Sequence, residues 1–395
     1  MKLPTTIFSF FLLLSIEIQA FVLSDQAKIS IITCEPGHEL YSAFGHTAIR
    51  VFDPQTQTDK VFNYGTFDFS TPNFYLKFIL GNLNYELSLA NFQDFYAEYQ
   101  TENRTIYEQE ILLPFPVLQQ LYDSLLQNYL PENRSYRYDF FGDNCSTRAF
   151  NILLAFAESR EIQGSLNEPT KLSYRQALKP LLAGSPWLST GINFLLGPFA
   201  DKKMNRKQTT FLPVLLMAEI EKTGLGSPPI VLFQGSGLAK QNQDFSWPMT
   251  LFWVLAFLLI AEVFWINTSQ KTSDQIDLII FTISGILGLL LLFLWIFSQH
   301  ISLRFNLNIL WANPLFLLML FTIPQNHKKT SQIILLLYGL LMFFVLINWN
   351  KMPQKFPIEM MPVATFLAFR AISRVFNFGK KADKIAIEDN TGEPL

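Results

Sequence analysis

The chain has 395 residues, half of them hydrophobic, and a formal net charge at pH 7 of only −2. This charge balance excludes the basic stripe that a nucleic-acid-binding surface needs, so no nucleic-acid partner is expected. The hydrophobic share is high for a wholly soluble protein, and it is concentrated after residue 247. The composition therefore predicts an extramembrane N-terminal region followed by a membrane region.

Residues 1–20 resemble a secretory signal, because Lys2 precedes an apolar run that ends near the small residue Ala20. An uncleaved membrane anchor is the alternative. In either case the following residues lie outside the cytoplasm, where disulfides form. The two cysteines, Cys34 and Cys145, therefore have two open interpretations: halves of a structural bridge, or free thiols of which one is reactive.

Residues 21–163 have the pattern of one α+β domain. Alternation of polar and apolar residues predicts strands, and apolar residues at helical spacing predict a helix at 116–129. The predicted strands are 28–33, 46–52, 60–67, 85–89 and 103–113. His46 begins one of these strands directly after Gly45, so its imidazole stands on a rigid support, as a general base should.

Cys145 stands at the predicted start of a helix. Asp143 and Asn144 are good N-cap types, and residues 148–158 carry apolar side chains at helical spacing. Unpaired N–H groups and the positive end of the helix dipole favour a thiolate there, which lowers the thiol pKa below about 8.5. Such a thiol suits attack on a carbonyl group, and a small buried core residue is the alternative.

Residues 164–246 mix Pro, Gly and Ser with short apolar pieces, and we expect an extension that links the domain to the membrane. Residues 247–379 have the pattern of four to five transmembrane helices, followed by a polar tail at 380–395. The apolar candidates are 248–266, 278–297, 306–323, 332–348 and 356–378. The last of these contains charged residues and Pro362, and it is either a fifth span or an interfacial helix.

Several blocks of the sequence resemble the Lnb-type bacterial lipoprotein N-acyltransferase family. They are CEPG at 34–37, YSAFGHTAIRV at 41–51, NYGTFDF at 63–69, PENR at 131–134, YDFFGDNC at 138–145, His300, and NILWANP at 308–314. The soluble domain of that family is similar to circularly permuted papain-like thiol enzymes. In those enzymes the histidine precedes the cysteine, as His46 precedes Cys145 here.

The resemblance implies an α+β permuted papain-like thiol-enzyme domain followed by an all-α transmembrane bundle. It places the protein in the bacterial inner (cytoplasmic) membrane, with its N-terminal domain on the periplasmic side. Cys145 would be the nucleophile and His46 the base. The implied reaction moves an acyl chain from a membrane phospholipid, through a thioester, to the N-terminal amine of a diacylglyceryl-cysteine lipoprotein. The third, orienting residue is open among His38, Glu39, Tyr41 and Arg50.

We expect no cofactor and no metal, because the sequence has neither a Gly-rich phosphate loop nor paired cysteines at zinc-binding spacing. Candidate contacts with the lipid substrates are Tyr41, Arg50, Tyr64, Asn144, His300, Asn308, Trp311 and Asn313. Interfacial anchoring and helix capping are the alternative for the polar residues of the membrane region. Two other functions stay open: a membrane-tethered papain-like peptidase or amidase, and a non-catalytic scaffold with a Cys34–Cys145 disulfide.

Overall fold

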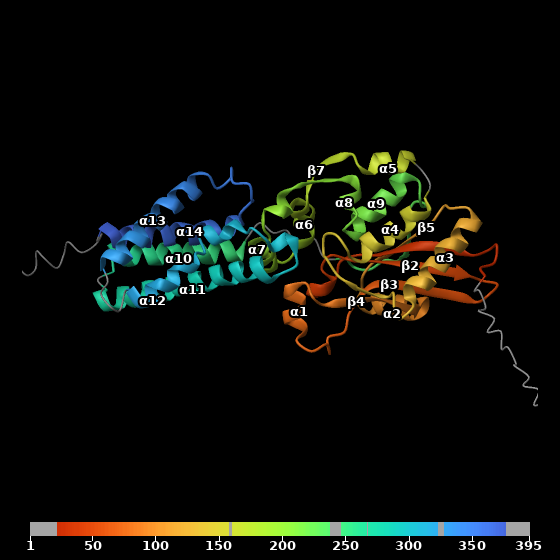
Figure 1. Cartoon of the computed structure of the whole chain (residues 1–395), viewed down its shortest axis with the longest axis horizontal. Helices are drawn as coiled ribbons and strands as arrows, with labels where there is room; N and C mark the ends of the chain where they lie inside the picture. The colour runs from red at the N-terminus through yellow and green to blue at the C-terminus, as the bar shows by residue number, and fades with distance from the viewer. Residues whose placement is uncertain (1–21, 158–159, 238–245, 267, 323–327, 377–395) are drawn as a thin grey trace, which may run out of the picture.

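The computed structural model describes residues 22–157, 160–237, 246–266, 268–322 and 328–376. An α+β unit and a helical bundle lie end to end along the long axis of the molecule (Figure 1). The predicted order of an α+β domain followed by apolar helices is confirmed. The expected signal segment at 1–20 and the polar tail at 380–395 lie outside the described residues.

A seven-stranded sheet forms the centre of the N-terminal unit, and all its neighbouring strands are antiparallel. In spatial order the strands are β6 (Ser135–Arg137), β4 (Asn84–Asn91), β3 (Thr58–Thr66), β2 (His46–Asp53), β1 (Lys28–Cys34), β5 (Ile106–Glu110) and β9 (Ile230–Phe233). The five predicted strands correspond to β1 to β5. The edge strands β6 and β9 were missed, because three or four residues are too few for alternation to show.

Helices cover both faces of this sheet. On one face α3 (Phe115–Tyr129), α4 (Cys145–Phe156) and α9 (Pro213–Thr223) share an apolar core with the strands. On the other face, Phe95 and Tyr99 of α2 (Phe92–Thr101) pack near Cys34. The sequence pattern predicted α3 and α4. It did not predict α2, which has only two buried residues and so a weak apolar period.

The extension after residue 164 is folded where the structure describes it. It contains α5 (Arg160–Leu166), β7 (Pro169–Ser173), α6 (Tyr174–Leu182), α7 (Pro186–Leu195), β8 (Lys203–Asn205) and α8 (Arg206–Thr209), followed by α9 and β9. Tyr174, Leu178 and Phe211 form a second core with Phe141 of the loop before α4. The extension therefore packs against the start of α4.

Among the described residues, three helices are long and apolar enough to span a membrane: α10 (Trp247–Phe264), α11 (Gln270–Phe297) and α13 (Lys328–Ile347). The candidate span at 306–323 is not one continuous helix. The region instead forms two short helical segments bent by 54°, which count as a fourth span only if taken together. Pro314 lacks an N–H group, and the side chains of Asn306 and Asn313 cap separate turns, so one regular helix cannot form.

The segment predicted at 356–378 contains α14 (Met361–Phe376), which runs along α10 and α13 (Figure 1). Its length of about 24 Å is shorter than the hydrocarbon core of about 30 Å. Its buried Arg370 pairs with Glu262 of α10 and Asp277 of α11. Partners on two other helices thus neutralise this charge inside the bundle.

The N-terminal unit and the bundle are joined by hydrogen bonds close to the end of α11. The hydroxyl of Ser298 donates to the carbonyl of Ile79 at 3.0 Å, and the N–H of Gln299 donates to the carbonyl of Leu80 at 2.9 Å. The side chain of Asn306 also donates to the carbonyl of Phe194 at the end of α7. These contacts fix the sheet domain on the end of the bundle.

Candidate active site

Cys145 is the first residue of α4, as predicted, and Asn144 caps the helix. The side-chain oxygen of Asn144 accepts from the N–H groups of Ser146 and Thr147 at 2.9 Å, while the hydroxyl of Thr147 accepts from the N–H of Asn144. The Asn144 amide nitrogen donates to the carbonyls of Phe140 and Phe211. This cap is buried and fully paired, so it holds the first turn of α4 rigidly.

His46 begins β2 and hydrogen-bonds the thiol of Cys145. Its Nε2 lies 3.3 Å from Oδ1 of Asn63, which accepts a hydrogen bond from it. With the proton on Nε2, the lone pair of Nδ1 is left for the sulfur. The ring also stacks on Tyr99, with centroids 6.2 Å apart. The structure thus brings the two predicted catalytic residues together.

The backbone of two strands makes room for the thiol. Gly65 of β3 has a φ of +95°, and a Cβ there would lie 3.6 Å from the Cβ of Cys145. A side chain at this φ would be strained, and its Cβ would be in ordinary van der Waals contact with the nucleophile. The N–H of Thr47 hydrogen-bonds Cys145, and the Thr47 hydroxyl lies 2.9 Å from that of Ser146. β2 therefore touches both the sulfur and the first turn of α4.

The surroundings of the thiol favour its ionised form. Burial raises the pKa of Cys145, but the charge and hydrogen bond of His46, the N–H of Thr47 and the hydroxyl of Ser146 more than offset burial, so the pKa is lowered. Burial lowers the pKa of His46, whereas the Cys145 thiolate and Asn63 raise it, and the net shift is upward. These directions describe a thiolate–imidazolium pair, the reactive form of a thiol enzyme.

Cys34, at the end of β1, is directly opposite His46 in the sheet. Its side chain is 1% exposed, and burial raises the pKa of its thiol. Both cysteines are free thiols in this structure. The disulfide required by the scaffold alternative is therefore not formed here.

Asn63 is the polar partner of His46 that the sequence reasoning missed. The four candidates for that role lie elsewhere: His38, Glu39 and Tyr41 are exposed, and Arg50 pairs with Asp59 and Glu108 on the sheet. A usable signal was present, because Asn63 interrupts the apolar run at 61–64 on the strand next to His46. A polar side chain in a central strand needs a partner.

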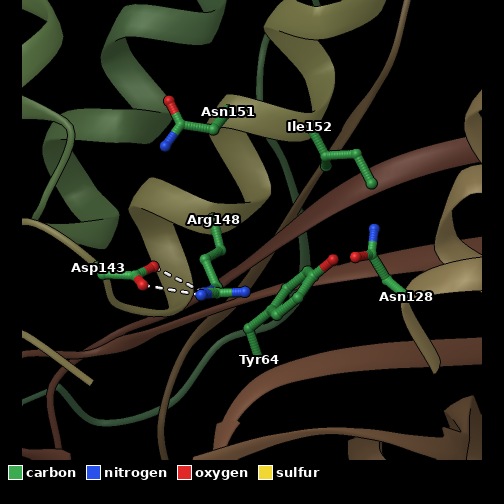
Figure 2. Close-up of a pocket in the computed structure, with 6 residues that line it drawn as sticks. All are labelled: Tyr64, Asn128, Asp143, Arg148, Asn151 and Ile152. Atoms are coloured by element: carbon green, nitrogen blue, oxygen red, sulfur yellow. Dashed lines mark hydrogen bonds and ion pairs between the residues drawn. The ribbon is translucent and has the colours of Figure 1, made fainter. Parts of the chain in front are cut away.

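A pocket of about 350 Å³ opens beside α4, lined by Tyr64, Asn128, Asp143, Arg148, Asn151 and Ile152 (Figure 2). Arg148, one turn beyond Cys145, donates two hydrogen bonds to Asp143 at 2.6 and 2.7 Å. Its guanidinium also lies 3.5 Å from the ring centroid of Tyr136. Of the predicted substrate contacts, Tyr64 lines this pocket.

The hydroxyl of Tyr136 is buried and has no hydrogen-bond partner among the described residues. It would lie 3.9 Å from a Cβ at Gly65, the position that also neighbours Cys145. Burial first, and the charge of a Cys145 thiolate second, raise the pKa of this phenol. A buried donor without a partner, close to the nucleophile, is available to hydrogen-bond a substrate oxygen.

The predicted contacts of the membrane region have structural partners. His300 Nε2 donates to the carbonyl of Phe78 at 3.0 Å, and its Nδ1 lies 3.7 Å from Asp139. Asn308 is fully buried and accepts from the indole N–H of Trp311. Asn313 caps a short 3-10 turn. These residues join the bundle to the N-terminal unit or order its end, and a contact with substrate stays a prediction for them.

Within the described residues, no three His, Cys, Asp or Glu side chains come together as metal ligands would. The fold and the site together define a membrane protein that carries an extramembrane α+β domain with a paired thiol and imidazole. Residues 17–179 match the family model described as the Lnb N-terminal periplasmic domain, and residues 240–382 match the Lnb transmembrane domain. The chain belongs to the Lnb family, and its N-terminal domain is periplasmic. No curated protein and no solved structure matches it.

Proposed function

We propose that this protein is a lipoprotein N-acyltransferase of the inner membrane, built on a permuted papain-like domain. Membrane phospholipid is the acyl donor, and a diacylglyceryl-cysteine lipoprotein is the acceptor. The observation that carries the proposal is the hydrogen-bonded pair of His46 and Cys145 at the capped start of α4. Family membership supports the substrate class, and the adjoining membrane bundle gives access to lipid substrates.

In the first step, the Cys145 thiolate attacks the carbonyl carbon of a phospholipid ester. A carbon–sulfur bond forms, and the carbonyl oxygen becomes an oxyanion. The N–H of Cys145, at the start of α4, and the unpaired hydroxyl of Tyr136 are its proposed donors. When the intermediate collapses, the ester carbon–oxygen bond breaks. His46 gives its proton to the departing lysophospholipid oxygen, and a thioester remains.

In the second step, the α-amine of the lipoprotein attacks the thioester. His46 is now neutral, and it removes a proton from the attacking nitrogen. A carbon–nitrogen bond forms while the carbon–sulfur bond breaks, so the thiolate–imidazolium pair is restored. Asn63 acts as a positioning residue, because its oxygen holds the proton on Nε2 and directs Nδ1 at the sulfur.

The test is to incubate the purified full-length protein with phospholipid vesicles and measure its intact mass. We expect one added acyl chain, removable by neutral hydroxylamine as a thioester is. The mass should not change in a Cys145→Ala variant and should change normally in Cys34→Ala. No acylation of a folded wild-type protein would overturn the mechanism.

Adding a diacylglyceryl lipopeptide then separates transfer from hydrolysis. Transfer predicts that the acyl chain moves from Cys145 to the lipopeptide amine and resists hydroxylamine. Release of free fatty acid without N-acylated lipopeptide would favour the hydrolase alternative. In cells that lack other transferases, Cys145→Ala should leave lipoproteins without the N-acyl chain, which mass spectrometry of their N-termini measures.

A further inference from the structure

One stretch of the periplasmic domain exposes apolar side chains without an evident structural need. Exposed side chains gather at Phe69, Tyr75, Leu76, Phe78 and Ile79. The last four belong to α1 (Phe74–Leu80), a helix of seven residues with no buried residue. Elsewhere in residues 22–157 and 160–237, large exposed apolar side chains stand singly or in twos. Such a concentration marks a surface that contacts another apolar phase.

The end of α1 is attached at the point where α11 leaves the membrane. The carbonyls of Phe78, Ile79 and Leu80 all accept hydrogen bonds from residues 298–300, directly after the apolar helix α11. Gly81, with a φ of +71°, allows this approach, since a Cβ there would lie 3.3 Å from Gln299. Figure 1 shows α1 at the end of the domain that faces the bundle. α1 is therefore level with the bilayer surface.

The composition of α1 suits a position at the bilayer surface. It combines aromatic and aliphatic residues with a single charge, Lys77, and has no acidic residue. Aromatic rings are favoured at the boundary between lipid head groups and chains, and a lysine there contacts anionic head groups. A surface that binds a protein partner has no reason to lie beside the end of a membrane-spanning helix. The continuity with α11 thus favours lipid over a protein surface.

An aromatic row connects α1 with the nucleophile. Phe74 of α1 lies 5.7 Å from Phe67, Phe67 lies 5.3 Å from Tyr85, and Tyr85 stacks on Tyr138 at 4.3 Å between centroids. Tyr138 lies 3.9 Å from the position of a Cβ at Gly65, which is itself adjacent to Cys145. Apolar side chains therefore extend from the bilayer level to the thiol.

We propose that residues 69–80 insert into the outer leaflet beside the bundle, and that the row from Phe74 to Tyr138 guides the acyl chain of a lipid to Cys145. The occupant of this surface is the lipid bilayer itself. The delivery role rests on the proposed acyltransferase function, whereas the insertion does not. Two measurements keep these parts separate.

The first measurement is the depth of α1. A nitroxide label is placed on Tyr75→Cys in full-length protein that carries Cys34→Ala and Cys145→Ala, in nanodiscs of phosphatidylcholine and phosphatidylglycerol. We expect high accessibility to oxygen and low accessibility to a water-soluble nickel chelate. The control is Leu112→Cys, an exposed apolar residue after β5, at the end of the sheet away from His46. Equal nickel accessibility at both sites, or shielding of position 75 only after lipoprotein is added, would overturn insertion.

The second measurement is delivery. The variant Tyr75→Ser/Leu76→Ser is compared with wild type in acylation of Cys145 by vesicle phospholipid and by a water-soluble short-chain ester. We expect the ratio of the phospholipid rate to the soluble-ester rate to fall about tenfold, and Leu112→Ser to leave the ratio unchanged. An unchanged ratio in the double variant would overturn delivery. If wild type accepts neither donor, the proposed function fails, while the label still decides membrane contact.

Discussion

The two cysteines show how differently one domain treats two buried thiols. Cys34 ends β1 and Cys145 begins α4, and both side chains are at least nine-tenths buried. Burial raises the pKa of each thiol. For Cys34 the opposing charge of Arg104 is too weak to compensate, because Glu102 neutralises it at 2.7 Å. For Cys145 the imidazole and the neighbouring donors more than compensate.

The difference shows that depth in the core does not decide whether a thiol reacts. Both residues are neighbours of His46, since Cys34 pairs with it across the sheet and Cys145 hydrogen-bonds its ring. Only Cys145 combines this contact with a helix start and a backbone donor. Directed hydrogen bonds therefore separate the reactive thiol from the structural one.

The largest effect expected is from removing each thiol in turn. Cys145→Ala removes the only proposed nucleophile, so we expect acyl transfer to fall by about 10³-fold or more. Cys34→Ala should change the rate less than about twofold, because its thiol is protonated and packed in the core. Rates with phospholipid and lipopeptide, with circular dichroism to confirm folding, measure both. A comparable loss in the two variants would contradict the assignment.

The second-largest effect is expected in the pH dependence with which iodoacetamide alkylates the two cysteines. Only about 1% of an ordinary thiol of pKa 8.5 is ionised at pH 6.5. Because the pKa of Cys145 is lowered, its thiolate persists below the usual range, and its alkylation should exceed that of Cys34 by about 100-fold at pH 6.5. Peptide mass spectrometry of time-quenched samples distinguishes the two sites.

His46→Gln provides the control for this profile. Without the imidazolium, the pKa of Cys145 should rise, and its alkylation should then increase only near and above pH 8.5. An unchanged profile would mean that the helix start alone lowers the pKa. Cys34 should stay unreactive in both proteins until they are unfolded.

A smaller effect is expected at Asn63, which orients the base. A hydrogen bond to a charged group contributes about 1.5–3 kcal/mol, which corresponds to a loss of about 10- to 160-fold in Asn63→Ala. The loss should be mainly in kcat, and Asn63→Gln should recover part of it. An effect on KM alone would indicate substrate binding instead of positioning.

Periodicity predicted the central strands and the helix that carries Cys145, because their apolar faces repeat regularly. The sequence also predicted a cap at Asp143 or Asn144, because both are good N-cap types, and Asn144 is the residue that caps the first turn. It missed the pairing of His46 with Asn63, residues 17 apart, since that contact depends on strand pairing and on a bulge between Tyr64 and Thr66. The proximity of His46 to Cys145 came only from family resemblance.

In the membrane region too, the sequence did not predict a feature that depends on contacts between distant residues. The two helical segments of the candidate span at 306–323 pass a hydropathy test for a span when they are taken together. The side chains of Asn306 and Asn308, however, donate to the carbonyl of Phe194, more than 100 residues earlier. Those tertiary bonds hold the segment in short turns. Local sequence therefore predicts that the chain is apolar there, but not that the helix is broken.

The smallest effect is expected from removing the cap of α4, and it separates the role of Asn144 in stability from its role in the reactivity of Cys145. Asn144→Ala removes a helix cap and leaves two buried carbonyls without their donor, so we expect a loss of about 1–2 kcal/mol and a lower Tm. The matched control is Ser173→Ala, since Ser173 caps α6 with the same reciprocal pattern. Both variants should melt earlier in thermal-shift assays. Only Asn144→Ala should also move the alkylation profile of Cys145 to higher pH, because only that cap orders the turn that holds the thiolate.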